Sequence, residues 1–230
     1  RLEGGGKRLK ILLAAPANPL STSAYYERAL RRGHEVITCG PRLDEGMMAQ
    51  WKEWEDQHAF KPAGVGDADK MGLLSRLVRD NDVSLPWGEV AAEELSGSLP
   101  PGWRPDLVLW VDAGREFLLR NPGHFGCPTA CLIGDTHTGQ QAWRIDYARQ
   151  FDQVFLMFVR QHMQAFRDAG CERVTWLPAA CDPEIHRRFD VPKAYDVVFV
   201  GQTLPQWHAD RVRLLERLQQ AGFDLRVDSK

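Results

Sequence analysis

The chain has 230 residues, of which 43% are hydrophobic and 26% are charged. This length is long for one domain and short for two complete ones, and the composition is typical of a globular protein with a substantial core. The 29 basic and 31 acidic residues give a formal net charge of -2. Such a balance provides no global field to attract nucleic acid or an acidic membrane surface, so we expect neither partner.

The cysteine usage and the lengths of the apolar runs indicate where the protein resides. Five cysteines lie in or beside apolar stretches, and no CxxC pair occurs. Buried free thiols in a reducing cytoplasm are the expected state. The longest uncharged apolar runs are strand-sized, which predicts no membrane span. Residues 1–8 are polar and glycine-rich and lack the apolar core of a signal peptide, so they are interpreted as a flexible leader.

The first elements form a strand, a helix and a second strand. Residues 10–18 are a short apolar run that ends in a Pro/Asn turn, which is typical of a buried strand. The following hydroxyl residues can cap a helix, which Gly33 ends. Residues 34–40 then form a strand. Their succession predicts a right-handed βαβ unit.

Residues 41–86 are less regular, and apolar residues at helical spacing predict two helices joined by a loop around 61–66. Regular alternation then resumes. Strands are predicted over 105–114, 128–137, 151–158 and 173–183, with a short helix over 114–119 and longer helices over 140–149 and 160–170. After a linker with two prolines, a strand from Asp196, a helix ended by Gly222 and another strand follow.

Strands alternating with helices predict an α/β fold with a Rossmann-like, doubly wound parallel sheet. The strand pattern restarts at Asp196, which predicts the beginning of a second Rossmann-like domain. The expected organisation is a leader over 1–8, a first domain over 9–190, and a linker with a first βαβ unit over 191–230.

Ligands of open α/β sheets bind beyond the carboxyl ends of the parallel strands. This rule selects Asp135 and His137, which end a predicted buried strand. A carboxylate and an imidazole two residues apart could act as acid, base or substrate clamp, because imidazole titrates near neutrality. The alternative is that Asp135 caps the following helix and His137 is a polar neighbour.

The same rule selects further residues that could bind substrate. They are Asn18 and Ser21 after the first strand, Asp112 and Arg115, Asp182, and Gly201 with Gln202 in the second domain. Helix capping is the alternative role for Asn18, Ser21 and Asp112. The glycine would permit close approach of a ligand to the backbone.

Common catalytic and cofactor signatures are absent from the sequence. The first strand is not followed by GxGxxG, and no HExxH, GxSxG, Walker or kinase motif occurs. No metal site or bound cofactor is therefore expected.

Several sequence blocks resemble the CgeB-like glycosyltransferase family. They are PDLVLWVDAG, CLIGDTH, FDQVFLMF, RVTWLPAACDPEIH, YDVVFVGQ and the helix ADRVRLLERL, and their order spans about residues 104–218. Residues 41–86 do not take part in this resemblance.

The resemblance implies a GT-B fold, in which the N-terminal domain shapes the acceptor side. The C-terminal domain of such enzymes holds most contacts to a nucleotide-sugar donor, and no metal is required. Asp135 and His137 would then face the acceptor, and Gly201 and Gln202 would approach the donor phosphates. The later part of the C-terminal domain is absent, so this chain alone is not expected to turn over substrate.

Two other functions remain open at this point. One is a non-catalytic binding or scaffold module derived from a GT-B protein. The other is a different sugar-nucleotide enzyme with two Rossmann-like domains, such as an epimerase.

Overall fold

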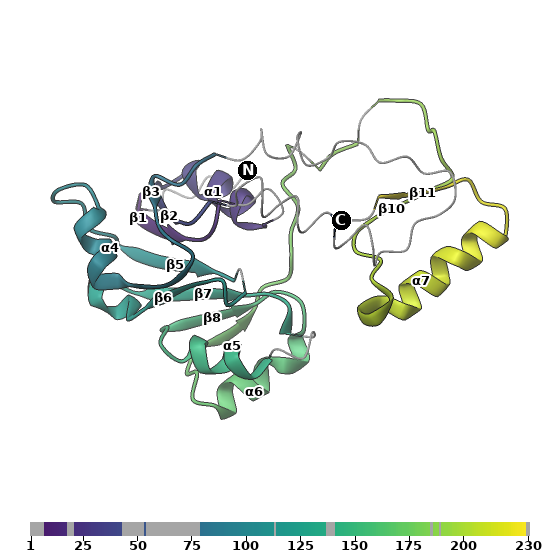
Figure 1. The fold of residues 1–230 in the computed structure, drawn as a ribbon. Coiled ribbons are helices and arrows are strands. Elements are labelled where there is room, and N and C mark those ends of the chain that lie inside the picture. The colour runs from purple at the N-terminus through teal and green to yellow at the C-terminus, as the bar shows by residue number, and fades with distance from the viewer. Residues whose placement is uncertain are drawn as a thin grey trace. The chain divides into compact units, whose positions relative to one another are not determined.

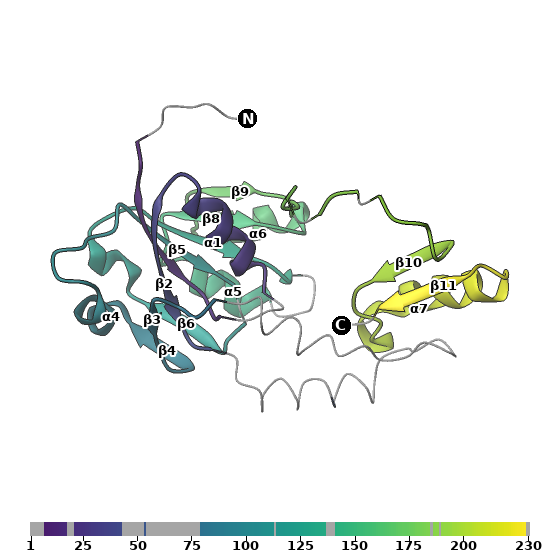
Figure 2. The same cartoon turned by 90° about the horizontal axis from the view of Figure 1, so that it is seen from above.

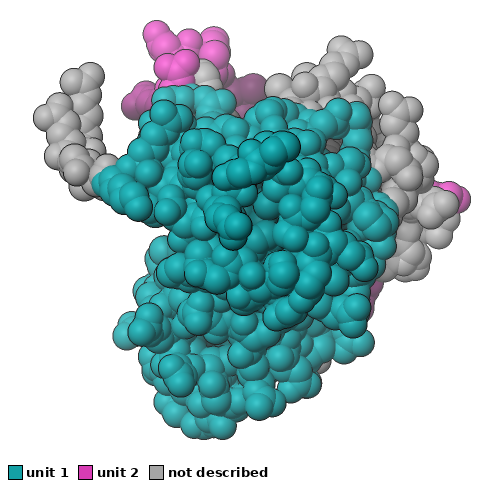
Figure 3. All heavy atoms as spheres, turned by 90° about the vertical axis from the view of Figure 1, so that its left-hand side faces the viewer, with its two compact units in different colours: residues 1–43, 74–186 teal, residues 44–73, 187–230 magenta. Residues whose placement is uncertain are grey.

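The computed structural model describes residues 7–17, 21–42, 53, 79–112, 114–136, 141–184, 186–188 and 190–228. The two helices predicted within 41–86 lie almost wholly outside these ranges. The chain divides into two compact units, drawn in two colours in Figure 3. Unit 1 comprises residues 1–43 and 74–186, and unit 2 comprises residues 44–73 and 187–230.

Unit 1 is built on a sheet of seven described strands (Figure 1), of which six were predicted from the sequence and β3 was not. All neighbouring strands run parallel. In spatial order they are β3 (Val83–Ser84), β2 (Glu35–Gly40), β1 (Lys10–Ala14), β5 (Leu107–Val111), β7 (Thr129–Ile133), β8 (Gln153–Leu156) and β9 (Val174–Trp176). This order establishes the α/β, doubly wound Rossmann-like class.

Helices cover both faces of the sheet, and their order can be followed in Figure 2. The described helices of unit 1 are α1 (Ser23–Arg31), α4 (Ala92–Ser98), α5 (Gln141–Ala148) and α6 (Met163–Asp168), with 3-10 turns η1 (Pro122–Phe125) and η3 (Arg160–His162). Tyr26 and Leu30 of α1 pack on one face. Leu95, Ala148 and Phe166 place α4, α5 and α6 on the other face.

The strand β1 shows why the central strands are continuous apolar runs. Ile11 and Leu13 point into the core beneath α1, whereas Leu12 and Ala14 point into the core beneath the other helices. Each of these four side chains is at most 1% exposed. Because successive strand residues face opposite sides, a strand covered on both faces must be apolar at every position.

The helix predicted over 114–119 is wrong, because the chain forms a strand there. β6 (Phe117–Arg120) pairs in parallel with β4 (Gly88–Ala91) in a separate two-stranded sheet. Phe117 and Leu119 are fully buried, and Leu118 between them is only half-buried. Trp110 Nε1 donates to the Phe117 carbonyl at 3.2 Å. Long-range partners therefore select the period-two conformation in a stretch too short for periodicity to decide.

Unit 2 contains a βαβ unit with its own sheet. β10 (Val197–Val200) and β11 (Leu225–Asp228) pair in parallel with each other and with no strand of the seven-stranded sheet. They are joined by α7 (Pro205–Gln220). The described core of unit 2 includes Leu204, Val212, Leu215 and Val227, which are all buried. A separate sheet after residue 196 is what the sequence pattern indicated, whereas the exact domain bounds remain a prediction.

The cysteines are free thiols, but they are not all buried as predicted. Cys39, Cys131 and Cys171 are buried, Cys127 is half-buried and Cys181 is exposed. Burial raises the pKa of the Cys39 and Cys131 thiols, which keeps them protonated and unreactive. None of the described helices is both long and apolar enough to cross a membrane.

We predict that Gly40→Ala lowers the free energy of unfolding by about 2 kcal/mol or more. Gly40 has φ of 152°, and a Cβ there would lie 2.1 Å from the Ala15 carbonyl oxygen. Urea denaturation measures the change. The matched control is Gly33→Ala, where no atom lies within 4 Å of the added Cβ and a change of no more than about 1 kcal/mol is expected. Equal losses in the two variants would contradict the prediction.

Candidate functional site

The strand order identifies the edge of unit 1 where a ligand is most readily bound. From β1 the chain moves outward to β2 and β3, returns to β5 beside β1, and continues outward through β7, β8 and β9. The order therefore reverses between β1 and β5. In open α/β sheets, the crevice beyond the carboxyl ends of the strands at such a reversal is the usual ligand site.

Asp112 follows β5 at this edge, and its side chain is only 3% exposed. Its Oδ2 accepts from Arg144 Nε at 2.6 Å and from the Gly134 amide at 3.1 Å, while Oδ1 accepts from the Gly114 amide at 2.9 Å. The Arg144 side chain, on α5, is 5% exposed. Asp112 thus joins the ends of β5 and β7 to helix α5. The helix that it was expected to cap is not formed.

Gly134, at the end of β7, has no side chain, so the backbone there can lie close to the side chains of Met157 and Phe158. A Cβ at this position would lie 3.3 Å from Met157 Cε and 3.7 Å from Phe158 Cε2. Asp135 follows and is exposed, whereas Thr136 is buried. His137 lies outside the described residues, so its relation to Asp135 and Asp112 remains a prediction.

Arg115 and Trp143 form a cationic and aromatic pair next to Asp112. The guanidinium carbon of the exposed Arg115 lies 5.5 Å from the centroid of the Trp143 ring. That of Arg144 lies 4.6 Å from the same ring. The charge of Arg144 is neutralised by Asp112. Of the two arginines that contact the Trp143 ring, Arg115 is therefore the one with an exposed positive charge. A guanidinium on an aromatic face is well placed for anionic or planar groups.

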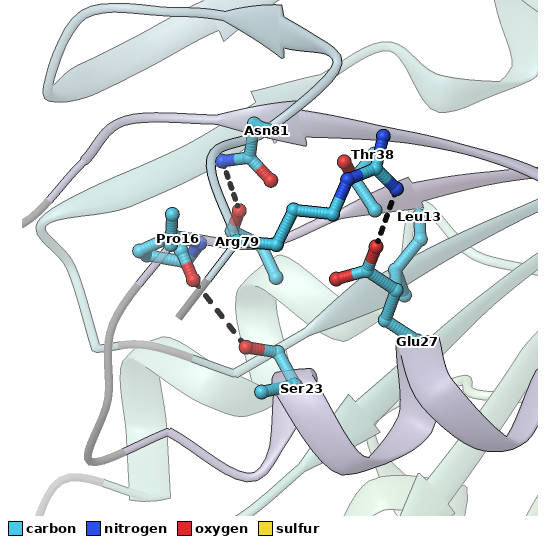
Figure 4. Close-up of a pocket in the computed structure, with 10 residues that line it drawn as sticks. Leu13, Pro16, Ser23, Glu27, Thr38, Arg79 and Asn81 are labelled. Atoms are coloured by element: carbon cyan, nitrogen blue, oxygen red, sulfur yellow. Dashed lines mark hydrogen bonds and ion pairs between the residues drawn. The ribbon is translucent and has the colours of Figure 1, made fainter. Parts of the chain in front are cut away.

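On the other side of the reversal, a cavity of about 20 Å³ lies beyond the ends of β1 and β2 (Figure 4). Its volume suits about one water molecule, not a sugar. Ser23 borders it, and its amide donates to Ser21 Oγ at 3.2 Å. Ser21 therefore supports the start of α1, although the N-cap residue of this helix is Thr22, which makes no side-chain capping bond. Asn18, predicted to bind substrate, lies outside the described residues.

Charged residues close this cavity on the side of α1. Arg79 Nη1 donates to Glu27 Oε1 at 3.2 Å, as Figure 4 shows.

Asp82 Oδ2 accepts from the Thr38 amide at 2.9 Å and from Arg31 Nη2 at 2.7 Å. Burial opposes ionisation of Asp82, but these hydrogen bonds and the nearby guanidinium groups outweigh it and lower the pKa of that carboxyl.

Asp182, after β9, lies against α1 and is engaged there. Its side chain is 5% exposed and lies 3.1 Å from Arg28 Nε and 3.2 Å from Arg32 Nη2. Oδ1 also accepts from the Glu184 amide at 3.0 Å. The hydrogen bond from this amide, together with both arginines, lowers the pKa of Asp182 despite its burial. Within unit 1, Asp182 therefore fastens the segment after β9 to α1.

In unit 2, Gly201 and Gln202 form the turn between β10 and α7. Gly201 has φ of 153°, and a Cβ there would lie 3.1 Å from Phe199 Cζ. The Gln202 carbonyl accepts from Arg211 Nη1 at 2.7 Å. The Arg211 guanidinium also lies 5.5 Å from the Phe199 ring centroid. Arg211 thereby holds the turn in place, which the sequence did not indicate.

The structure thus brings Asp112, Arg115 and Asp135 to the carboxyl edge of unit 1. It places Asp182 in a separate cluster with α1, and Gly201 and Gln202 in unit 2. Trp143 and Arg144 complete the carboxyl edge but were not predicted, since they lie inside α5 and not after a strand. Within the described ranges, no group of three His, Cys, Asp or Glu side chains is arranged to hold a metal ion.

Comparisons with known proteins give limited further information. No protein-family model and no curated protein matches the chain. Among solved structures, one described as the glycotransferase of kitacinnamycin aligns with 97% of this chain at 12% identity and a TM-score of 0.44. The chain spans 66% of the length of that protein. The assignment of the fold therefore rests on the strand order of unit 1.

We predict that Asp112→Ala and Arg144→Met each lower the free energy of unfolding by about 3–5 kcal/mol, because each leaves a buried charge without its partner. The double variant is expected to lose less than the sum of the two single losses, as measured by a double-mutant cycle. Arg120→Met is the control, since its pair with Glu89 is 64% and 54% exposed and should contribute below about 1 kcal/mol. If the losses of unfolding free energy in the two single variants simply add in the double variant, Asp112 and Arg144 are not energetically coupled.

The Asp82 network predicts a dependence of stability on acidity. Because the pKa of Asp82 is lowered by folding, its contribution is complete above the pKa of the unfolded chain, about 3.9. It is lost as the pH falls through the lower pKa of the folded state. Urea denaturation of the wild type and Asp82→Asn between about pH 6 and pH 3 measures this. The variant should be less stable near neutrality, and the difference should shrink at the acidic end. A constant difference would contradict this assignment.

Proposed function

We propose that the protein is a glycosyltransferase, which moves a sugar from a nucleotide-sugar donor to an acceptor hydroxyl. The observation that carries this proposal is the group of polar side chains at the carboxyl edge, next to the reversal between β1 and β5. The ordered sequence blocks that resemble CgeB-like glycosyltransferases support it further. Acceptor binding is assigned to unit 1 and donor contacts to unit 2.

In the proposed reaction, the acceptor oxygen forms a bond to the anomeric carbon of the sugar. The bond between that carbon and the donor phosphate breaks, and the nucleoside diphosphate leaves. Asp135 or His137 takes the proton of the acceptor hydroxyl, since a positioned carboxylate or imidazole is an effective general base. Asp135 is exposed directly after β7, which suits such contact.

Arg115 and Asp112 have different roles in this proposal. Arg115 presents an exposed guanidinium beside Trp143 and binds the acceptor or an anionic group of the substrate. Asp112 has both carboxylate oxygens occupied and is 3% exposed. We therefore assign it a positioning role, in which it fixes the segment that carries Asp135. Correct placement of reacting groups is itself a large part of catalysis.

Donor binding is assigned to the turn after β10. Gly201 permits close approach of a phosphate to the backbone, and the start of α7 follows within a few residues. Helix N-termini and glycine turns favour phosphate groups because their amides point at the ligand. Gln202 belongs to the same turn, and Arg211 positions it through the carbonyl contact.

The test uses the protein expressed from its complete reading frame. Release of UDP or GDP from nucleotide-sugars is measured with and without a mixed acceptor pool, and products are identified by mass spectrometry. At least one of the variants Asp135→Asn and His137→Ala is expected to lower kcat by about 10²–10⁴-fold while leaving the donor dissociation constant unchanged. Asp146→Asn, which changes an exposed carboxylate on α5, is the matched control and should retain activity.

Each outcome of this test decides between the alternatives. Sugar transfer that is lost in at least one of the two variants supports the proposal and identifies the base. Nucleotide binding without release or transfer would favour a non-catalytic binding module. Conversion of the donor sugar without transfer would favour an epimerase or a related enzyme. Activity unchanged by both substitutions would overturn the roles given to Asp135 and His137.

A further inference from the structure

A second pocket lies at the opposite, amino-terminal edge of the seven-stranded sheet. Its volume is about 490 Å³, within the usual range for small-molecule sites. It is formed by the end of α4, the loop that leads into β5, and the turn η1 before β7. The residues that line it are Ser96, Gly97, Leu99, Pro100, Pro101, Gly102, Trp103, Arg104, Pro105, His124 and Phe125.

The walls of this pocket are fixed in place before any ligand binds. The loop at 99–105 contains three prolines, which restrict its backbone. The Trp103 amide donates to the Pro100 carbonyl at 3.0 Å, and Trp103 Nε1 donates to Glu35 Oε1 at 2.6 Å. Leu99, Trp103 and Phe125 also pack against the buried core. A rigid pocket loses little conformational entropy on binding, which favours affinity for small ligands.

The lining combines aromatic rings with hydrogen-bonding groups of both kinds. Trp103 and Phe125 line the pocket and are only half-buried. Arg104 lines the pocket and is exposed. Ser96 offers a hydroxyl oxygen, and the last turn of α4 leaves carbonyl oxygens without helical partners. Hydrogen-bond donors, acceptors and aromatic residues therefore line the same pocket.

The charges around the pocket favour a neutral ligand. Glu35 accepts the indole hydrogen bond of Trp103, and Glu93 lies 3.7 Å from His124. Carboxylates thus contact two of the residues that line the pocket, which differs from an anion site built of cations alone. A sugar matches this environment, because its hydroxyl groups both donate and accept while its C–H faces pack on aromatic rings.

We propose that this pocket is a binding site for a neutral saccharide, separate from the site at the carboxyl edge. The proposal does not depend on the glycosyltransferase function. The two sites lie at opposite ends of the parallel strands, because the loop before β5 and the turn before β7 precede the strands that Asp112 and Asp135 follow. Arg104 contributes hydrogen bonds and Trp103 contributes ring surface to the bound sugar.

The experiment is saturation-transfer NMR on the complete protein with maltose, cellobiose, lactose and chitobiose as probes. At least one of them is expected to receive saturation, with a dissociation constant in the millimolar range. Arg104→Ala and Trp103→Phe should each weaken binding by at least about fivefold. Arg104 is exposed, so its substitution is not expected to disturb folding, and thermal unfolding checks both variants.

Two controls separate this site from other surfaces. Arg173→Ala removes an exposed arginine that also precedes a strand but does not line the pocket, and it should leave saccharide binding unchanged. Arg217→Ala, which removes an exposed arginine on α7 of unit 2 that does not line the pocket, should also leave it unchanged. Failure of every saccharide to bind, or binding unaffected by both Arg104→Ala and Trp103→Phe, would overturn the proposal. Benzoate binding at the pocket in preference to the saccharides would overturn it as well.

Discussion

The buried ion pair between Asp112 and Arg144 is the interaction that organises the carboxyl edge of unit 1. Taking two charges out of water is costly, and their attraction repays that cost only when the remaining hydrogen-bonding capacity is also used. Here the Gly114 and Gly134 amides donate hydrogen bonds to the Asp112 carboxylate and so use its remaining capacity as an acceptor. The pair therefore specifies geometry more than it adds stability: it fixes the exits of β5 and β7 relative to α5.

Most of the sheet could be predicted from the sequence because its strands are buried on both faces. Every position of β1 must then be apolar, and such runs are easily distinguished between polar turns. The segment at 114–119 was misassigned for the opposite reason. It is short, and its conformation is decided by the contact of Trp110 with the Phe117 carbonyl and by Tyr147, whose hydroxyl bonds both backbone groups of Leu119. Partners that lie outside the segment leave no pattern within it.

The candidate site was predictable only in part, and the division has a physical basis. The position of a strand end is given by topology, so Asp112, Arg115 and Asp135 could be selected without coordinates. Whether a strand-end carboxylate faces a ligand or a neighbouring arginine depends on how the helices are rotated. Asp182 meets Arg32, 150 residues earlier in the chain, and Asp112 meets Arg144. Neither pairing follows from spacing.

This self-pairing also limits what unit 1 can do by itself. Once Asp112 and Arg144 neutralise each other and Asp182 is held by α1, Arg115 and Asp135 are the described members of the predicted site that stay exposed at this edge. A cation and a carboxylate can orient an acceptor and move a proton, whereas recognition of a diphosphate requires several amides or cations. We therefore propose that donor binding falls to the Gly201 turn of unit 2.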